Sequence, residues 1–318
     1  MTASRKPARG RSSARPRTIV PRDYDRASAE RYWGDERRRL KDEFRIVLSA
    51  GEPPYVNAAY HVWETMSFIR ALKPKRGMRV LDLACGLGRV SAPLALTGAT
   101  VIGVDNAFAM VAQAAAKTKR AAKSEGVKTR AGYAQAYSGF LPFADGSFDA
   151  VLCLGLLEHL PAWLQERTLA ECLRVLKQDG ALYLVLNNNR SLLLRAGRDN
   201  RFRQARQLDN GYFCGLVDRV SLVTRLAKRG ARVEELGSNA HYAVLRHALH
   251  GRPMKPAESR EAEHAFVAAT DRDLTDPHQG EFGATCADHF VYRIVKQKAA
   301  AKKKPAVAKR AGAAKRRG

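Results

Sequence analysis

The sequence has no long apolar run and little cysteine. None of its apolar stretches reaches the roughly 18 residues of a membrane-spanning helix, and its first residues, MTASRKPARGRSSARPR, lack the apolar core of a secretory signal. The five cysteines are odd in number and form no CxxC pair or His/Cys cluster with metal-ligand spacing. These absences argue against a disulfide framework, and we expect free thiols, no metal site and a cytoplasmic protein.

Acidic residues are absent from both ends of the chain. The 318 residues include 56 Lys and Arg against 31 Asp and Glu, a net charge of +25. Residues 1–22 hold seven of these bases and residues 296–318 hold ten, whereas the segment 23–295 is only mildly basic. Because both ends lack large apolar side chains, we predict that they are disordered tails. Such tails either keep the protein soluble or bind nucleic acid and other polyanions without sequence specificity.

Between the tails, short apolar runs alternate with helical patterns. The first strands are predicted at 79–83, 100–105, 128–134, 148–154 and 181–186, with helices at 90–96, 107–123 and 161–176. One or two helices precede them within 24–72, and a helix at 218–229 and strands at 231–236 and 290–295 follow, with an insertion at 240–288. This order predicts an α/β fold with a doubly wound, mostly parallel, seven-stranded Rossmann-like sheet.

A glycine-rich turn, VLDLACGLGR, follows the first predicted strand. Gly86 and Gly88 allow a tight turn and let a ligand approach bare backbone at the carboxyl edge of the sheet. Asp105 ends the second strand, where an acid accepts hydrogen bonds from the ribose hydroxyls of an adenosine. A nicotinamide-dependent enzyme would share these features. Against that alternative, Asp82 precedes the turn, and Ser91 replaces the third glycine of a pyrophosphate-binding loop.

Four segments in order distinguish the two alternatives: VLDLACGLGR, VIGVD, LPFADGSFDAVLCLGLLEHLP and LAECLRVLKQDGALYLV. From residue 78 to about residue 191 the chain resembles class I, Rossmann-like S-adenosylmethionine-dependent methyltransferases, a broad group that includes quinone-biosynthesis methyltransferases. The resemblance implies S-adenosylmethionine as cofactor. In this resemblance Asp82, Gly86 and Gly88 line its methionine part, and Asp105 binds its ribose. Asn106, Met110 and the backbone of Ala134 or Gln135 contact its adenine, and Leu154 lies near its sulfonium. Tyr133 stands where the family usually has an acid that reads adenine.

The resemblance also divides the chain. It implies a methyltransferase domain at 23–295, with leading helices at 23–76, a donor-binding core at 77–190, and an acceptor-side region with an insertion at 191–288. Methyl transfer from a sulfonium needs alignment and exclusion of water rather than a metal or a nucleophile. If the acceptor must lose a proton, His159 is the candidate general base, unless it only orders the loop that follows the fourth strand. The neighbouring Glu158 has the same two interpretations.

The acceptor is expected to be a small molecule. An RNA or protein acceptor is the alternative, suggested by the basic tails and by an arginine cluster within residues 190–206. A second alternative is a polyanion-binding protein with an inactive Rossmann-like body. The intact set of Asp82, Gly86, Gly88 and Asp105 argues against that loss of activity.

Overall fold

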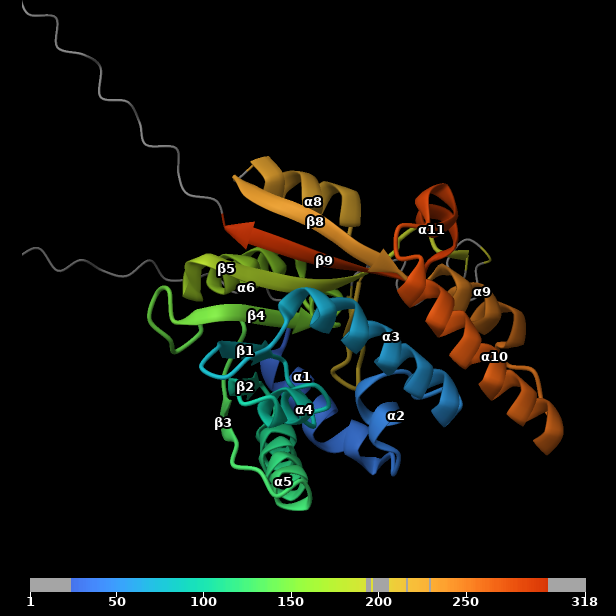
Figure 1. Cartoon of the computed structure of the whole chain (residues 1–318), viewed down its shortest axis with the longest axis horizontal. Helices are drawn as coiled ribbons and strands as arrows, with labels where there is room; N and C mark the ends of the chain where they lie inside the picture. The colour runs from blue at the N-terminus through green and yellow to red at the C-terminus, as the bar shows by residue number, and fades with distance from the viewer. Residues whose placement is uncertain (1–23, 193–195, 197–205, 216, 229, 297–318) are drawn as a thin grey trace, which may run out of the picture.

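The computed structural model describes residues 24–192, 196, 206–215, 217–228 and 230–296 (Figure 1). The two predicted tails, apart from Lys296, therefore lie outside the described residues. So do Arg195, Arg198, Arg201 and Arg203 of the arginine cluster. Within the described part of the chain, no helix is long and apolar enough to cross a membrane.

A single seven-stranded sheet organises the fold. The strand order is β3-β2-β1-β4-β5-β9-β8. Neighbours are parallel from β3 to β5, whereas β9 runs antiparallel to both β5 and β8. The strands are β1 (Arg79–Leu83), β2 (Thr100–Asp105), β3 (Arg130–Gln135), β4 (Phe148–Leu154), β5 (Leu176–Asn187), β8 (Ala231–Ser238) and β9 (His289–Lys296). The predicted seven-stranded, mostly parallel Rossmann-like sheet is confirmed.

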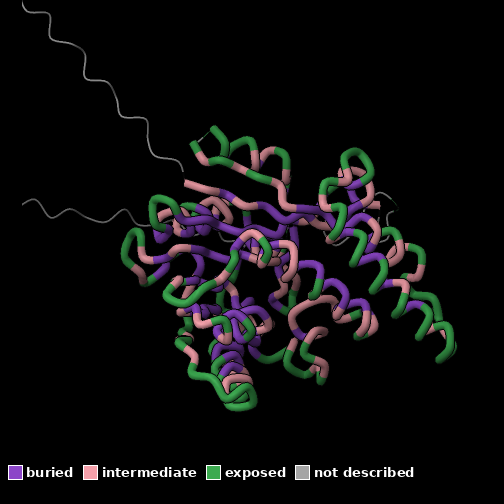
Figure 2. Tube along the Cα trace, viewed as in Figure 1, coloured by how far each residue is buried: buried purple, intermediate pink, exposed green. Residues whose placement is uncertain are grey.

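Helices cover both faces of the sheet because its strands are apolar on both sides. In β5, Leu182 and Leu184 belong to the apolar cluster that contains α6 (Ala162–Val175) and α8 (Arg219–Lys228). Tyr183 and Val185 point the other way, toward α3 (Pro54–Leu72) and α4 (Ser91–Leu96). Figure 2 shows the buried trace passing through the sheet between these layers. Burial on both faces is typical of parallel strands with uninterrupted apolar runs.

The predicted insertion is helical. It contains α9 (Ala240–Leu249), α10 (Pro256–Thr275) and α11 (Gly280–Cys286), and Phe266 of α10 and Tyr242 of α9 join the apolar cluster on the α3 side. Helix α5 (Phe108–Ser124), the remaining helix next to the parallel strands, follows β2. One connection differs from the predicted alternation: residues 136–147, all described, link β3 to β4 without a helix. An isolated bridge between Tyr137 and Phe140 folds this loop back on itself.

Of the helices predicted within 24–72, α3 is confirmed, whereas the residues before it, which we call the leading segment, form only short pieces. They are α1 (Arg26–Arg31), η1 (Tyr32–Glu36, a π-helix), η2 (Arg37–Arg39) and α2 (Glu43–Val47). Asp42 caps α2 by accepting a hydrogen bond from the backbone N–H of Arg45 at 2.8 Å. The guanidinium of Arg37 donates to the carbonyls of Ile46 and Leu48, each at 2.7 Å, and to that of Arg45. These bonds fold the segment back on itself beside the sheet.

A small hairpin joins this leading segment from far along the chain. Its strands are β6 (Arg206–Gln207) and β7 (Phe213–Cys214). The side-chain amide of Gln207 donates to the carbonyl of Asp25 at 2.9 Å and accepts from the N–H of Asp25 at 2.6 Å. The hairpin and α1 are therefore held together by a reciprocal pair of hydrogen bonds.

Candidate active site

The glycine-rich turn after β1 has an unusual backbone. Ala84, Gly86 and Gly88 adopt φ values of 61°, 51° and 73°, which L-residues with a side chain rarely adopt. A Cβ built on Gly88 would lie 2.9 Å from the Cβ of Ala114 on α5. Only glycine at position 88 lets the turn lie this close to α5 without displacing it.

Asp105 connects this turn to the end of β2. Its Oδ2 accepts a hydrogen bond from the N–H of Gly86 at 3.0 Å, and its Oδ1 accepts one from the N–H of Ala107 at 3.0 Å. Burial raises the pKa of the carboxyl, and the hydrogen bonds from Ala107 and Gly86 oppose that shift. The backbone thus fixes the orientation of the carboxylate, which keeps further lone pairs for a ligand.

Asp82 lies within the strand that leads into the turn. Its carboxyl is 4% exposed and accepts a hydrogen bond from the hydroxyl of Ser91. Burial raises its pKa to about 6, while the Ser91 hydrogen bond and the charge of Arg89 act in the opposite direction. The serine that replaces the third glycine therefore orients Asp82.

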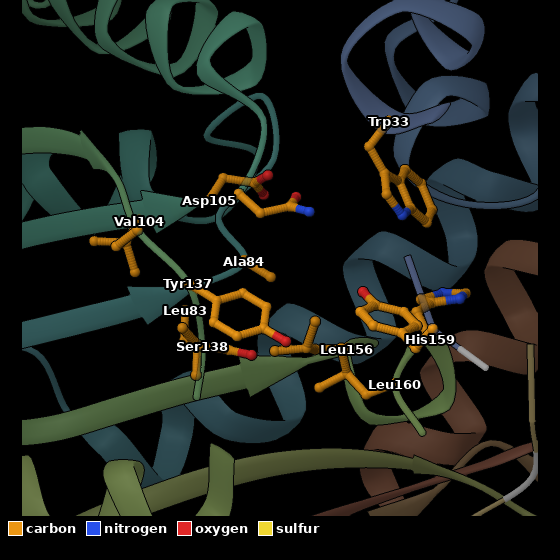
Figure 3. A pocket seen from close by; sticks show the side chains of 13 residues that line it. Trp33, Leu83, Ala84, Val104, Asp105, Tyr137, Ser138, Leu156, His159 and Leu160 are labelled. Carbon is orange, nitrogen blue, oxygen red and sulfur yellow. The ribbon is translucent and has the colours of Figure 1, made fainter. Parts of the chain in front are cut away.

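A pocket opens beside the turn, at the carboxyl ends of β1, β2 and β4. Figure 3 shows Trp33 and His159 across the pocket from Asp105 and Tyr137. The residues that line it are Tyr24, Trp33, Leu83, Ala84, Val104, Asp105, Asn106, Ala136, Tyr137, Ser138, Leu156, His159 and Leu160. This is the sheet edge at which open α/β folds bind their ligands.

Three of the predicted site residues line the pocket: Asp105, Asn106 and His159. Asp82, Gly86 and Gly88 belong to the strand and turn at its base. Met110 is 1% exposed and packs in a small apolar cluster with Ile46, Leu87 and Ala107. Leu154 packs against the apolar cluster on the α3 side. Neither Met110 nor Leu154 lines the pocket in this structure, so their proposed contacts with adenine and the sulfonium remain predictions.

The backbone predicted to read adenine, at Ala134 or Gln135, does not line the pocket, so this contact remains a prediction. Strand β3 continues to Gln135, and the chain turns only at Ala136, whose N–H donates to the carbonyl of Asp105 at 2.9 Å. Ala134 and Gln135 are therefore exposed on the outermost strand. The Gln135 amide donates to the carbonyl of Asn106 at 2.8 Å. The pocket is lined instead by Ala136, Tyr137 and Ser138.

The leading segment supplies pocket residues that the sequence did not identify. Tyr24 and Trp33 line the pocket from outside the sheet. The available signal was the pair Tyr32 and Trp33, two adjacent aromatic residues in an otherwise charged stretch. Periodicity assigned that stretch to helices but gave no information on where they dock.

His159 is held as a neutral base. Its Nδ1 lies 3.1 Å from the carbonyl oxygen of Phe213 in the hairpin. Since a carbonyl only accepts hydrogen bonds, Nδ1 carries the proton and Nε2 keeps its lone pair. Burial, with a smaller contribution from the charge of Arg37, lowers the pKa of His159 to about 4, although the bond to Phe213 opposes the shift. The imidazole is therefore uncharged at neutral pH.

Glu158 faces a different environment from its neighbour. It is 7% exposed, and its Oε2 has no hydrogen-bond partner among the described residues. Burial raises its pKa to about 7, and the charge of Glu64 on α3 adds to the shift. Glu64 itself forms an ion pair with Arg89 of the glycine-rich turn at 2.5 Å. Glu158 is thus a buried carboxyl beside the site whose ionisation is unfavourable.

Because ionisation of Glu158 is unfavourable in the folded state, we predict that Glu158→Gln stabilises the protein in a pH-dependent way. The folded state retains the Glu158 proton up to a pH of about 7, whereas the unfolded state loses it near pH 4.5. As the pH rises through this window, ionisation therefore favours the unfolded state of the wild type but not that of the variant. Urea unfolding should show a gain of roughly 3 kcal/mol near pH 8 that disappears near pH 4.

The control for this change is Glu125→Gln, at the exposed end of α5. It removes a carboxylate without relieving burial, so its effect on the free energy of unfolding should be small at both pH values. An equal gain for Glu158→Gln at both pH values would contradict the burial argument.

Comparisons with known proteins agree with the fold and with the position of the pocket. Residues 81–184 match the family model described as "Methyltransferase domain". This part of the chain is therefore similar to methyltransferase domains. The match covers β1 to β5 and includes Asp82, Asp105 and His159.

Curated relatives support this assignment and differ in their acceptors. The chain is 37% identical over 91 residues to a ubiquinone biosynthesis O-methyltransferase of Azorhizobium caulinodans, covering 29% of this chain and 34% of that one. It is 42% identical over 149 residues to a demethylmenaquinone methyltransferase of Beutenbergia cavernae, covering 46% and 53%. A 23S rRNA uracil C5-methyltransferase of Shewanella piezotolerans is 46% identical over 77 residues, covering 24% and 17%. The chain thus spans between about a sixth and about half of these relatives.

A solved structure shares the fold. The magnesium protoporphyrin IX methyltransferase of Synechocystis, with bound SAH, aligns with a TM-score of 0.50 at 20% identity, covering 66% of this chain and 93% of that one. At this identity the likeness shows the common fold alone.

Proposed function

We propose that this protein transfers a methyl group from S-adenosylmethionine to a small-molecule acceptor. The observation that carries the proposal is the position of Asp105: a buried carboxylate, oriented by two backbone N–H groups, lines a pocket beside a glycine-rich turn. Such a carboxylate suits the two hydroxyls of a ribose.

The residues present fit such a donor. Asp105 would bind the ribose, and Asn106 with Ala136, Tyr137 and Ser138 would surround the adenine. The positive φ values of the turn leave bare backbone at positions 86 and 88, where a side chain would block close approach. Asp82 would act on the amino group of the methionine part, through water or directly.

The protein contributes alignment and exclusion of water. When bound, S-adenosylmethionine supplies a methyl group already activated by a sulfonium. Trp33, Leu156 and Leu160 give the pocket apolar walls, which strengthen electrostatic interactions inside it. His159 would accept a proton from an acceptor that must lose one, through the Nε2 lone pair that its bond to Phe213 leaves free.

The test is calorimetric titration of the purified protein with S-adenosylmethionine, with S-adenosylhomocysteine (SAH) and with NAD. We expect saturable binding of both adenosyl ligands and none of NAD, since Ser91 replaces the third glycine of a pyrophosphate-binding loop. Failure of both adenosyl ligands to bind folded protein would refute the proposal. Saturable binding of NAD alone would assign the site to a nicotinamide-dependent enzyme.

A further inference from the structure

Aromatic rings from three distant segments meet at the pocket. They are Tyr32 and Trp33 of η1, His159 after β4, and Tyr212 in the hairpin, and we call these four residues the ring cluster. The ring centroids of Trp33 and His159 are 5.1 Å apart, those of His159 and Tyr212 are 5.2 Å apart, and those of Tyr32 and Tyr212 are 5.0 Å apart. Trp33 and His159 also line the pocket that contains Asp105.

The ring cluster differs from the aromatic side chains of the core. All four of its residues are half-buried, whereas core rings such as Trp63 and Phe266 are almost completely buried. Trp33 meets His159 at an interplanar angle of 68° and Tyr212 at 67°. Because these rings are only half-buried and Trp33 and His159 line the pocket, part of their surface borders the pocket and can contact a flat ligand. The cluster therefore suits a planar aromatic molecule better than a flexible aliphatic one.

A fixed positive charge lies beside the ring cluster. The guanidinium carbon of Arg37 is 5.5 Å from the centre of the Trp33 ring. Its hydrogen bonds go to the backbone carbonyls of residues 45, 46 and 48, and within the described residues no carboxylate forms an ion pair with it. A cation without an acidic partner favours the ionised form of a weakly acidic ligand.

One proton acceptor also faces this region. Nδ1 of His159 is committed to the carbonyl of Phe213, so Nε2 is the nitrogen that can accept a proton from a ligand. The ring cluster thus offers ring surface, a positive charge and a hydrogen-bond acceptor close together. A hydroxylated aromatic ring has the complementary groups.

We propose that the acceptor is a planar phenol whose ring packs in the ring cluster and whose hydroxyl faces Nε2 of His159. The proposal rests on the proposed function, because the cluster adjoins the pocket assigned to the donor. As the phenol oxygen bonds to the methyl carbon, the carbon–sulfur bond breaks with its electron pair remaining on sulfur. The phenol proton passes to His159 Nε2, and the product is an aryl methyl ether.

The test uses 2-naphthol as the probe, titrated into the full-length protein saturated with SAH. Tyr212 belongs to the ring cluster without lining the donor pocket, so it is the residue to change. Tyr212→Leu should weaken 2-naphthol binding by on the order of tenfold, whereas Tyr212→Phe, which keeps the ring, should stay close to wild type. The control is Phe282→Leu. Phe282 is a half-exposed ring on α11 that contacts His241, and its substitution should leave 2-naphthol binding unchanged.

Turnover measurements complete the test. With S-adenosylmethionine, 2-naphthol should yield its methyl ether, and His159→Gln should lower kcat more than it raises KM for 2-naphthol. Cyclohexylmethanol, an alcohol without an aromatic ring, should not be methylated. Equal binding of 2-naphthol by wild type and Tyr212→Leu, or equal turnover of the two alcohols, would overturn the phenol proposal.

SAH titration of each variant separates this proposal from the function on which it rests. Wild type that binds SAH but neither binds nor methylates 2-naphthol would refute the phenol acceptor and leave the methyltransferase assignment intact. Wild type that does not bind SAH would refute the donor site itself. A loss of SAH affinity in Tyr212→Leu that matches its loss of 2-naphthol affinity would assign the ring cluster to the donor and so also overturn the proposal.

Discussion

Replacing Asp105 with alanine is expected to weaken SAH binding by about 100-fold or more. A carboxylate that accepts hydrogen bonds from two ribose hydroxyls contributes about 1.5–3 kcal/mol through each bond, and alanine removes both. The change also leaves the N–H groups of Gly86 and Ala107 without their acceptor. Calorimetric titration of SAH into wild type and variant, with circular dichroism to verify folding, measures the effect.

Asp149→Ala is the matched control. Asp149 is also a strand carboxylate that accepts a backbone hydrogen bond, from the N–H of Arg79 at 2.8 Å. It lies at the amino-terminal end of β4, however, and so at the edge of the sheet opposite the pocket. SAH should bind this variant as it binds wild type. If folded Asp105→Ala protein retained wild-type affinity, the ribose would have to bind elsewhere.

Gly88→Ala is expected to lower the free energy of unfolding by about 3 kcal/mol. The substitution adds the cost of a left-handed backbone to that of a contact within the packed interior. The new methyl group would lie 2.9 Å from the Cβ and 3.0 Å from the Cα of Ala114, and φ at this position is 73°. Urea unfolding monitored by circular dichroism measures the loss, and displacement of the turn should weaken SAH binding in the same variant.

Gly126→Ala separates the two costs. Gly126, just beyond α5, has a similar φ of 63°, but a Cβ there would have no atom within 4 Å. Its loss should be limited to the backbone term of about 1 kcal/mol. If both alanine variants lost the same free energy, packing against Ala114 would have no role in fixing the turn.

The central strands and the turn were predictable because their signals are local. β1, β2 and β4 begin and end at the predicted residues, since each is an apolar run bounded by polar or glycine-containing segments. Asp105 follows directly from this regularity: a parallel strand next to β1 places its last residue at the same edge as the glycine-rich turn.

The end of β3 was less predictable because this strand forms the edge of the sheet. Its sequence, RAGYAQ, has no continuous apolar run, and all six of its residues are exposed or half-buried. The strand ends where Ala136 hydrogen-bonds to the carbonyl of Asp105, which is a contact between strands that sequence spacing does not encode. Residues 136–138 line the pocket in place of the predicted Ala134 and Gln135, whose contact with adenine stays a prediction.

The contacts of Trp33 and Tyr212 were unpredictable for a different reason. They depend on docking between segments about 180 residues apart, such as the reciprocal bonds between Asp25 and Gln207. Hydrophobic periodicity predicts helices and strands, but it does not predict which loop docks on a sheet edge. Met110 illustrates the same limit, because its helix was predicted but its burial beside Ile46 and Leu87 depends on the leading segment.

The contact between the hairpin and α1 couples the two segments mechanically. A Cβ on Gly211 of the hairpin would lie 2.2 Å from the carbonyl oxygen of Ser28 in α1, so the two segments fit each other at backbone contact. Both lie outside residues 81–184, the part shared with the family. The matched part of the chain thus supplies the sheet edge of the pocket, while the hairpin and α1 fix each other on its opposite side. Because the two backbones are in contact at Gly211, a side chain at this position would have to displace α1 and, with it, the aromatic residues that follow α1.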